Sequence, residues 1–366
     1  MAERVGIVAV TQTKYRDYRP EVHFSELALE VVEPLLEQTG LTFAEDGSGI
    51  DATVTYTSDH WDGRTISGIN VEDVVGGHLR PEEKIAEDGA HAALYATLQI
   101  LSGHYDTVLV VAHTKESHTE GRLIENVGFD PVFQRRLGLD FLSAGAIQAR
   151  RYMTKYGVTP EQCAQVVVDN RGNAYNNPYA QAPLKLKVKD VLKSPLLADP
   201  IHELDAKPVS DGACAMIVAR ESKAKKLTDK PVWIKGVGSS YDAHFMGDRD
   251  LAESPALVDA VQRAYKMAGI GEPLKQINVV ELSEYYSYQE LMWLEGLGFC
   301  GPGEGGKLID SGVTKMGGKL PVNPSGGLLS GVPVNVAGLN RVAEVVLQLK
   351  GEAGARQVPG ARLGLA

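Results

Sequence analysis

Three neighbouring side chains, Ser283, Glu284 and Tyr285, carry groups that can donate, accept or relay a proton. They follow an apolar run at residues 277–282, which has the length and composition of a buried strand. Side chains at strand ends in α/β proteins commonly line a site. A hydroxyl, a carboxylate and a phenol at this point predict acid–base or oxyanion-stabilising chemistry.

A loop rich in glycine and proline lies further along the chain. Residues 322–327 read Val-Asn-Pro-Ser-Gly-Gly, and residues 331–338 read Gly-Val-Pro-Val-Asn-Val-Ala-Gly. This composition predicts a rigid backbone that approaches a ligand closely and then enters a helix. We therefore expect Ser325, Gly326 and Gly327 to contact the ligand.

Histidine and cysteine add few candidates. His91 lies on a helix predicted for residues 86–101, from which it can face a pocket. The cysteines, Cys163, Cys214 and Cys300, are far apart, which argues against a zinc site or a disulfide framework. No metal site is predicted, and the cysteine usage favours the cytoplasm.

Composition narrows the class of protein. The chain has 366 residues, of which 43% are hydrophobic and 23% charged, as in an ordinary globular protein. Its net charge of −10 disfavours nucleic acid as a partner. Its apolar runs are too short to span a bilayer, and the first residues contain no signal-peptide core.

The predicted elements alternate between strand and helix twice, around an irregular insert. The first set includes a strand at 4–11, helices at 25–38 and 86–101, and a strand at 105–112. The second includes strands at 232–237 and 277–282 and a helix at 255–268. This repetition indicates an α/β fold with an internal duplication. In the insert, residues 184–189 alternate apolar and basic side chains, which predicts a strand with Lys185 and Lys187 on one face.

The glycine loop resembles that of the thiolase superfamily, which reads asparagine-proline-x-glycine-glycine, three residues, then glycine-histidine-proline. Further segments are similar to the sterol-carrier-protein-type branch. These segments are residues 170–180, 191–195, 210–213, 303–307, 317–324 and 356–361. The similarity covers nearly the whole chain, in order.

The resemblance implies a five-layered αβαβα fold. Its first half would comprise residues 1–118 and 208–228, its loop domain residues 119–207, and its second half residues 229–366. Family chains continue past the position of Ala366 into a last strand, so we expect that strand to be absent from this sequence.

The resemblance also implies chemistry and partners. Family members act on coenzyme A thioesters in acyl-CoA and lipid metabolism, with coenzyme A as a substrate moiety and no covalently bound cofactor. Lys185 and Lys187 would bind its phosphates. We expect a homodimer, and possible association with the small zinc-ribbon/OB-fold protein that often accompanies this branch.

Two positions depart from the family's catalytic pattern. The nucleophilic cysteine aligns with Ala86, and the histidine of the glycine loop aligns with Val332. Alanine has no nucleophile, and valine cannot carry a proton. Tyr285 stands where the sterol-carrier branch has a cysteine that serves as acid and base.

Three functions remain open at this point. The first is an aldolase-like enzyme that cleaves or forms carbon–carbon bonds of acyl-CoA without an acyl-cysteine, within a hetero-oligomer. The second is a non-catalytic subunit of a thiolase complex. The third is a true 3-ketoacyl-CoA thiolase whose absent groups come from a partner.

Overall fold

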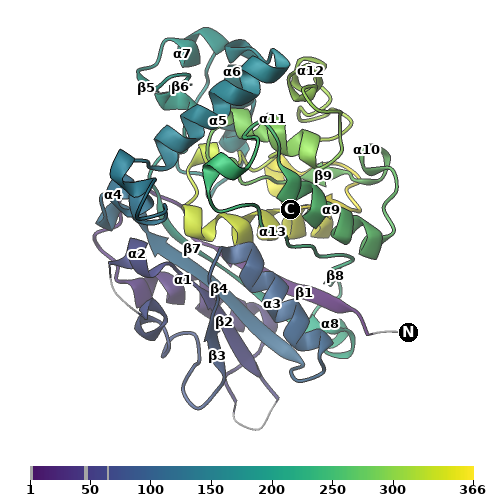
Figure 1. The fold of residues 1–366 in the computed structure, drawn as a ribbon. Coiled ribbons are helices and arrows are strands. Elements are labelled where there is room, and N and C mark those ends of the chain that lie inside the picture. The colour runs from purple at the N-terminus through teal and green to yellow at the C-terminus, as the bar shows by residue number, and fades with distance from the viewer. Residues whose placement is uncertain (1–2, 45–47, 64–65) are drawn as a thin grey trace.

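The larger sheet of the molecule has six strands in the order β3-β2-β4-β7-β1-β8 (Figure 1). The computed structural model describes residues 3–44, 48–63 and 66–366. β4 pairs in parallel with β2 and antiparallel with β7, and β7 also pairs antiparallel with β1. The strands are β1 (Val5–Gln12), β2 (Ala52–Tyr56), β3 (Glu82–Lys84), β4 (Thr107–Lys115), β7 (Asp211–Arg220) and β8 (Val232–Trp233).

Helices cover both faces of this sheet. On one face, α1 (Phe24–Thr39) buries apolar residues at helical spacing, among them Leu27 and Val31. On the other, α3 (Gly89–Leu101) and α13 (Val334–Lys350) pack together. All nine residues of β4 are buried as a result, because neither face of the strand meets solvent.

A second, smaller sheet lies on the far side of α13. It consists of β9 (Val279–Val280) and β10 (Gly364–Leu365) in parallel, and Val322 bridges to Val280 in parallel as well. Helices α9 (Pro255–Ala268) and α11 (Ser287–Gly296) supply apolar residues to the same core as β9. Helix, sheet, helix, sheet and helix follow in order, which confirms the predicted five-layered αβαβα fold.

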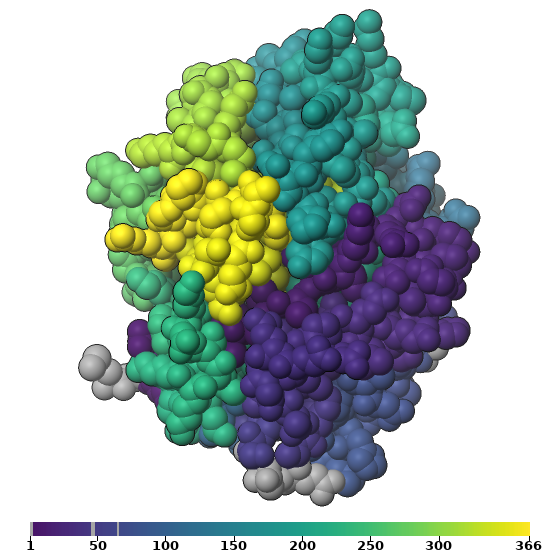
Figure 2. All heavy atoms as spheres, turned by 180° about the vertical axis from the view of Figure 1, so that it is seen from behind, coloured from purple at the N-terminus to yellow at the C-terminus, as the bar shows by residue number. Residues whose placement is uncertain are grey.

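The remaining elements lie mainly above the large sheet in Figure 1. Seen from behind, the yellow C-terminal residues lie left of the middle of the molecule, with teal residues to their upper right and purple N-terminal residues to their lower right (Figure 2). None of the described helices is both long and apolar enough to cross a membrane. The remaining helices and strands are α2 (Asp59–Asp62), α4 (Gly121–Val127), α5 (Phe141–Tyr156), α6 (Pro160–Asn173), α7 (Val188–Leu192), β5 (Leu196–Ala198), β6 (Ile201–His202), α8 (Glu221–Leu227), α10 (Pro273–Gln276) and α12 (Gly305–Asp310).

The strand predicted at residues 184–189 is wrong. Residues 184–187 belong to no strand, and helix α7 begins at Val188. The Asp190 carboxylate accepts the Lys187 backbone N–H at 2.8 Å, which favours a helical turn over an extended one. Lys185 and Lys187 are both exposed, but they do not share the face of a strand.

Two other predicted elements are shorter than expected. The strand predicted at 232–237 is a regular strand at Val232 and Trp233, beside β1; Ile234 still donates its backbone N–H to the Val5 carbonyl at 3.0 Å, and residues 235–237 belong to no strand. The helix predicted from residue 86 begins at Gly89, because the Asp88 side chain caps it by accepting two backbone N–H groups. Ala86 therefore precedes the helix and is exposed.

A buried ion pair joins α13 to the second sheet. Arg341 Nη1 donates to Glu281 Oε2 at 2.7 Å and to Ser325 Oγ at 2.9 Å, and both charged side chains are almost fully buried. Ser325 in turn donates its backbone N–H and its hydroxyl to the Glu281 carboxylate. The glycine loop is thus fixed to the core through Ser325.

We expect Arg341→Met to lower the free energy of unfolding by about 3–5 kcal/mol, because it leaves the Glu281 carboxylate buried without a cation. The matched control is Arg263→Met, whose pair with Asp259 is exposed and should contribute less than about 1 kcal/mol. Urea denaturation measures both. Equal losses in the two variants would contradict the role assigned to the buried pair.

Candidate active site

Tyr285 lies where the second half of the fold meets residues 119–207. Tyr285 lies in the segment that connects β9 to α11. The backbone N–H of Lys207 donates to the Tyr285 carbonyl at 2.9 Å, and Ala206 forms a bridge with Tyr286. These backbone contacts fix the position of Tyr285 independently of its side chain.

The Tyr285 hydroxyl donates a hydrogen bond to Glu125 Oε1 at 2.7 Å. Glu125 lies on α4, and its other oxygen accepts the Phe141 backbone N–H at 3.2 Å. The Phe141 ring meets the Tyr285 ring edge-on, with centroids 5.8 Å apart. Phenol and carboxylate are therefore held together in an apolar setting, in a geometry that allows direct proton transfer.

The electrostatics of this pair favour one shared proton. Burial raises the pKa of the Glu125 carboxyl, although the Tyr285 hydrogen bond acts in the opposite direction. Burial, together with the charge of Glu125, raises the pKa of Tyr285 well above its usual value. Tyr285 therefore stays neutral, and Glu125 becomes a stronger base than an exposed glutamate.

A cation lies over the ring of Tyr285. Lys207 Nζ is 5.3 Å from the ring centroid, close enough for a cation–π contact. The same ammonium group pairs with Glu116 Oε2 at 2.7 Å, and both side chains are buried. Negative charge that develops on the phenol oxygen would be stabilised by this ammonium group.

Glu116 connects Tyr285 to the segment that contains Val332. Its Oε2 also accepts the Ser210 backbone N–H at 2.9 Å, and its Oε1 accepts the Val334 backbone N–H at 2.6 Å. Val334 is the first residue of α13, and Val332 is buried just before it.

The segment that contains Ala86 also lies beside the start of α13. Tyr56 bridges the two, since its hydroxyl donates to the Glu87 carbonyl at 2.6 Å and lies 3.4 Å from Asn335 Oδ1. Asn335 Nδ2 donates to Thr114 Oγ1 at 3.2 Å. The structure therefore brings the segments of Ala86, Val332 and Tyr285 to one region.

Glu284 lies beneath the glycine loop, fully buried. Its carboxylate accepts N–H groups from Asn170, Asn323 and the Leu329 backbone, and burial raises its pKa to about 7. A Cβ on Gly327 would lie 1.9 Å from Glu284 Oε1, which explains the glycine at that position. The arrangement holds the loop against the core.

Ser283 and His91, the other two predicted catalytic residues, lie in surroundings unlike those of Tyr285 and Glu284. Ser283 is exposed beside Tyr285. His91 Nε2 lies 2.9 Å from Ser239 Oγ, and its interaction with Asp88 raises its pKa. His91 lines the groove between α9 and α13, and none of its described contacts is with Tyr285.

The residues predicted to contact coenzyme A fall into an exposed group and a buried group. Lys185 and Lys187 are exposed, with Lys185 Nζ 5.2 Å from the Tyr175 ring centroid. Ser325, Gly326 and Gly327 are buried, and the Ser325 side chain is already paired with Glu281 and Arg341. In residues 3–44, 48–63 and 66–366, no cluster of three histidine, cysteine or carboxylate side chains is arranged to hold a metal ion.

Sequence reasoning missed Glu125 and Lys207. Glu125 lies 160 residues from Tyr285 along the chain, on a short helix without a motif. Lys207 precedes the segment 210–213 that carries part of the family resemblance, and this proximity was the one available signal.

The comparisons with known proteins agree with the fold. A family model described as thiolase C-terminal domain-like matches residues 238–366. The chain is 34% identical to an acetyl-CoA acetyltransferase of Methanothermobacter thermautotrophicus over 371 residues, which covers 99% of this chain and 94% of that one. Sterol carrier protein 2 of Bos taurus is 35% identical over 223 residues, or 59% of this chain and 41% of the relative.

A solved structure described as the Ltp2-ChsH2(DUF35) aldolase matches with a TM-score of 0.82 and 26% identity. The match covers 98% of this chain and 92% of that one. Full-length sequence similarity and the five-layered fold lead to one conclusion: the chain belongs to the thiolase superfamily, in its sterol-carrier-protein-type branch.

Proposed function

We propose that this chain cleaves the carbon–carbon bond of a 3-hydroxyacyl-CoA by a retro-aldol reaction at Tyr285. The observation that carries the proposal is the hydrogen bond from Tyr285 to Glu125, under the ammonium group of Lys207. Such a relay supplies the base that a retro-aldol reaction needs. The similarity to a structure described as an aldolase supports the same reaction class.

The proposed reaction requires no covalent intermediate. The 3-hydroxyl proton passes to the Tyr285 oxygen while Tyr285 gives its own proton to Glu125. The bond between C2 and C3 breaks, C3 becomes the carbonyl carbon of an aldehyde or ketone, and the electron pair forms the enolate of the thioester. In this proposal the Ser283 hydroxyl donates a hydrogen bond to the enolate oxygen. The proton returns through Tyr285 to C2, which releases a shortened acyl-CoA.

The exposed cations Lys185 and Lys187 are the proposed contacts for the phosphates of coenzyme A. We further propose that the chain works as a homodimer within a hetero-oligomer in the cytoplasm, beside a small zinc-ribbon/OB-fold partner. The description of the solved aldolase names two components, Ltp2 and ChsH2(DUF35), which supports a two-component assembly here.

A non-catalytic subunit is the second candidate. The observation that favours it is the replacement of both family catalytic groups, by Ala86 and Val332. The two candidates differ in one measurable respect, which is turnover of a 3-hydroxyacyl-CoA by the purified protein.

We expect Tyr285→Phe to reduce cleavage of 3-hydroxyacyl-CoA by about 10²-fold or more, because it removes the hydroxyl that relays the proton. The matched control is Tyr286→Phe, whose ring packs against Gly145 and stacks on Tyr288. Mass spectrometry of the shortened acyl-CoA measures both. Equal activity in the two variants would remove Tyr285 from the mechanism, and absence of turnover in the parent protein would favour the non-catalytic subunit.

The pH profile tests the partner of Tyr285. Protonated Glu125 cannot accept a proton, so kcat/KM should fall as the pH decreases through the pKa of Glu125. Because burial raises that pKa, the fall should lie above the usual glutamate value of about 4.3. Glu125→Gln should lower kcat/KM and abolish this acid limb, whereas the exposed Glu120→Gln should leave it unchanged. An unchanged limb in Glu125→Gln would exclude Glu125 as the base.

A further inference from the structure

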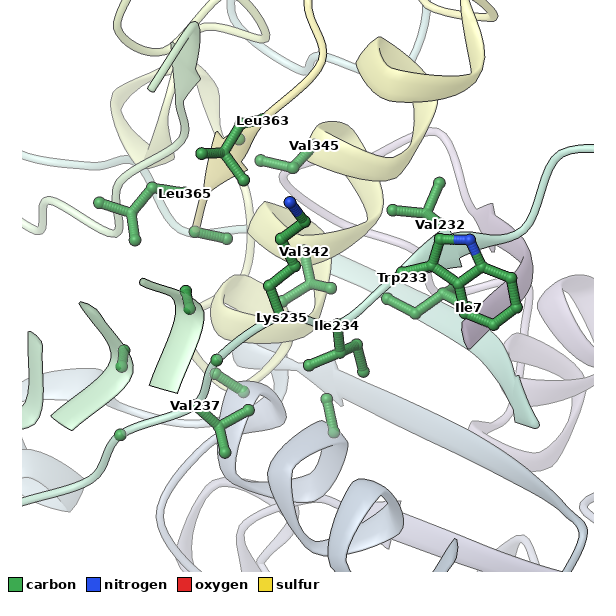
Figure 3. A pocket seen from close by; sticks show the side chains of 18 of the residues that line it. Ile7, Val232, Trp233, Ile234, Lys235, Val237, Val342, Val345, Leu363 and Leu365 are labelled. Carbon is green, nitrogen blue, oxygen red and sulfur yellow. The ribbon is translucent and has the colours of Figure 1, made fainter. Parts of the chain in front are cut away.

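Two buried carboxylates, Glu284 and Glu290, share the same pair of amide donors. Asn170 Nδ2 donates to Glu284 Oε1 at 3.1 Å and to Glu290 Oε2 at 2.8 Å. Asn323 Nδ2 donates to Glu284 Oε2 at 3.0 Å and to Glu290 Oε2 at 2.8 Å. All four side chains are almost fully buried. None of them lines the apolar groove between α13 and residues 232–237 that Figure 3 shows.

The glycine loop makes its turn at one of the two shared donors. Asn323 has a left-handed backbone, with φ of 47°, which asparagine adopts more readily than most residues. Its Oδ1 accepts the Leu282 backbone N–H at 2.7 Å, so its Nδ2 has to face the carboxylates. Its backbone carbonyl accepts the Gly326 backbone N–H at 2.9 Å. The turn of the loop is therefore bonded directly to both carboxylates.

Neither carboxylate has a cation as a hydrogen-bond partner. Among the described residues, the donors to Glu284 and Glu290 are all amide N–H groups. Elsewhere in the same core, buried glutamates are paired with cations, as Glu281 is with Arg341. Two negative charges that are close together and shielded from water are unstable unless a cation or a proton compensates them.

Two cations interact with Glu284 but are bonded elsewhere. Arg341 on α13 attracts the carboxylate, yet its guanidinium group is paired with Glu281 at 2.7 Å. Arg171 on α6 donates to the Ala182 carbonyl at 3.2 Å, and burial lowers its own pKa to about 10. Neither guanidinium group therefore neutralises the pair.

Anionic neighbours add to the repulsion. Asp169 on α6 acts on Glu290, and Glu281 acts on Glu284. Lys315 lies 3.8 Å from Asp169 and so compensates that residue first. Charged side chains on the surrounding helices are exposed or bonded to other residues, among them Glu161, Asp205, Asp259, Glu295, Lys307 and Asp310.

Both carboxyls therefore favour the protonated form. Burial raises the pKa of Glu284 to about 7 and the pKa of Glu290 well above its usual value. The charge of Glu284 adds to the effect on Glu290. Two carboxyls that interact this closely titrate as a pair, so the proton belongs to both.

We propose that Glu284 and Glu290 share one proton at neutral pH and that this proton holds the glycine loop against α6 and α11. With the proton present, one of the two groups is neutral, and both amides keep their bonds. When the proton is lost, two like charges repel each other across Asn170 and Asn323, and the turn at Asn323 loses its support. The pair is thus a pH-dependent switch in the loop, and it does not depend on the reaction proposed at Tyr285.

Urea denaturation of the 366-residue chain at about pH 5 and about pH 8 tests the proposal. Unfolded glutamates lose their protons near a pKa of about 4.3, whereas the folded pair keeps one. The stability of the fold should therefore decline as the pH rises from there through the raised pKa. Glu290→Gln carries a neutral group of similar shape at every pH. We expect the unfolding equilibrium constant to increase between the two pH values at least about tenfold more in the parent than in Glu290→Gln.

Two further variants complete this test. Glu344→Gln is the matched control, because Glu344 is equally buried but is paired with Arg356 at 2.8 Å. It should destabilise the fold at both pH values without reducing the difference between them. Glu284→Gln neutralises the other member of the pair and should reduce the pH dependence as Glu290→Gln does, so the test survives if one of the two does not fold. A parent-like pH dependence in the folded variants would overturn the proposal.

Hydrogen exchange followed by mass spectrometry locates the effect. At about pH 8, amides of residues 326–331 should exchange at least about tenfold faster in the parent than in Glu290→Gln, whereas those of β4 should not differ. Equal exchange of residues 326–331 in the two proteins would overturn the assignment of the proton to the glycine loop. A difference that extends equally to β4 would also overturn it, because the proton would then stabilise the whole fold and not the loop.

Discussion

The arrangement of the candidate site depends on the buried carboxylate of Glu116. Its Oε2 forms an ion pair with Lys207 Nζ at 2.7 Å and accepts the Ser210 backbone N–H at 2.9 Å. Its Oε1 accepts the Val334 backbone N–H at 2.6 Å. A carboxylate in this setting is stable only when it is fully paired, so each of these partners is held in place. Through them, the end of β4, the start of β7 and the start of α13 meet at one point. Lys207 then reaches the ring of Tyr285 from this fixed position.

The scaffold of the superfamily is retained here, while the two catalytic positions of the family carry Ala86 and Val332. Glu281, Glu284 and Arg341 fix the glycine loop to the core, and Tyr56 joins the segment of Ala86 to that of Asn335. Neither Ala86 nor Val332 can form an acyl-enzyme or move a proton. The phenol of Tyr285 and the carboxylate of Glu125 lie in the same region, and a proton can pass between them along their hydrogen bond. This combination favours proton-relay chemistry over covalent catalysis.

Much of the fold could be predicted from local signals. Helix α9 matches its predicted range because proline opens it and glycine closes it in the left-handed conformation. Local signals failed where distant contacts decide the structure: residues 184–187 alternate like a strand but lead into α7, and residues 235–238 do not continue the strand β8. For the site, the motif around Tyr285 was visible in the sequence. Glu125 was not, because only folding brings residues so far apart in the chain together.

The most direct test of the central claim is intact-protein mass spectrometry during turnover. The purified chain would be mixed with isotopically labelled 3-hydroxyacyl-CoA and stopped in acid while the shortened acyl-CoA is still forming. Catalysis through Tyr285 and Glu125 predicts product without any increase in the mass of the protein. An acyl group attached to the protein, at Cys163, Cys214, Cys300 or elsewhere, that forms and decays at the rate of turnover would contradict the account.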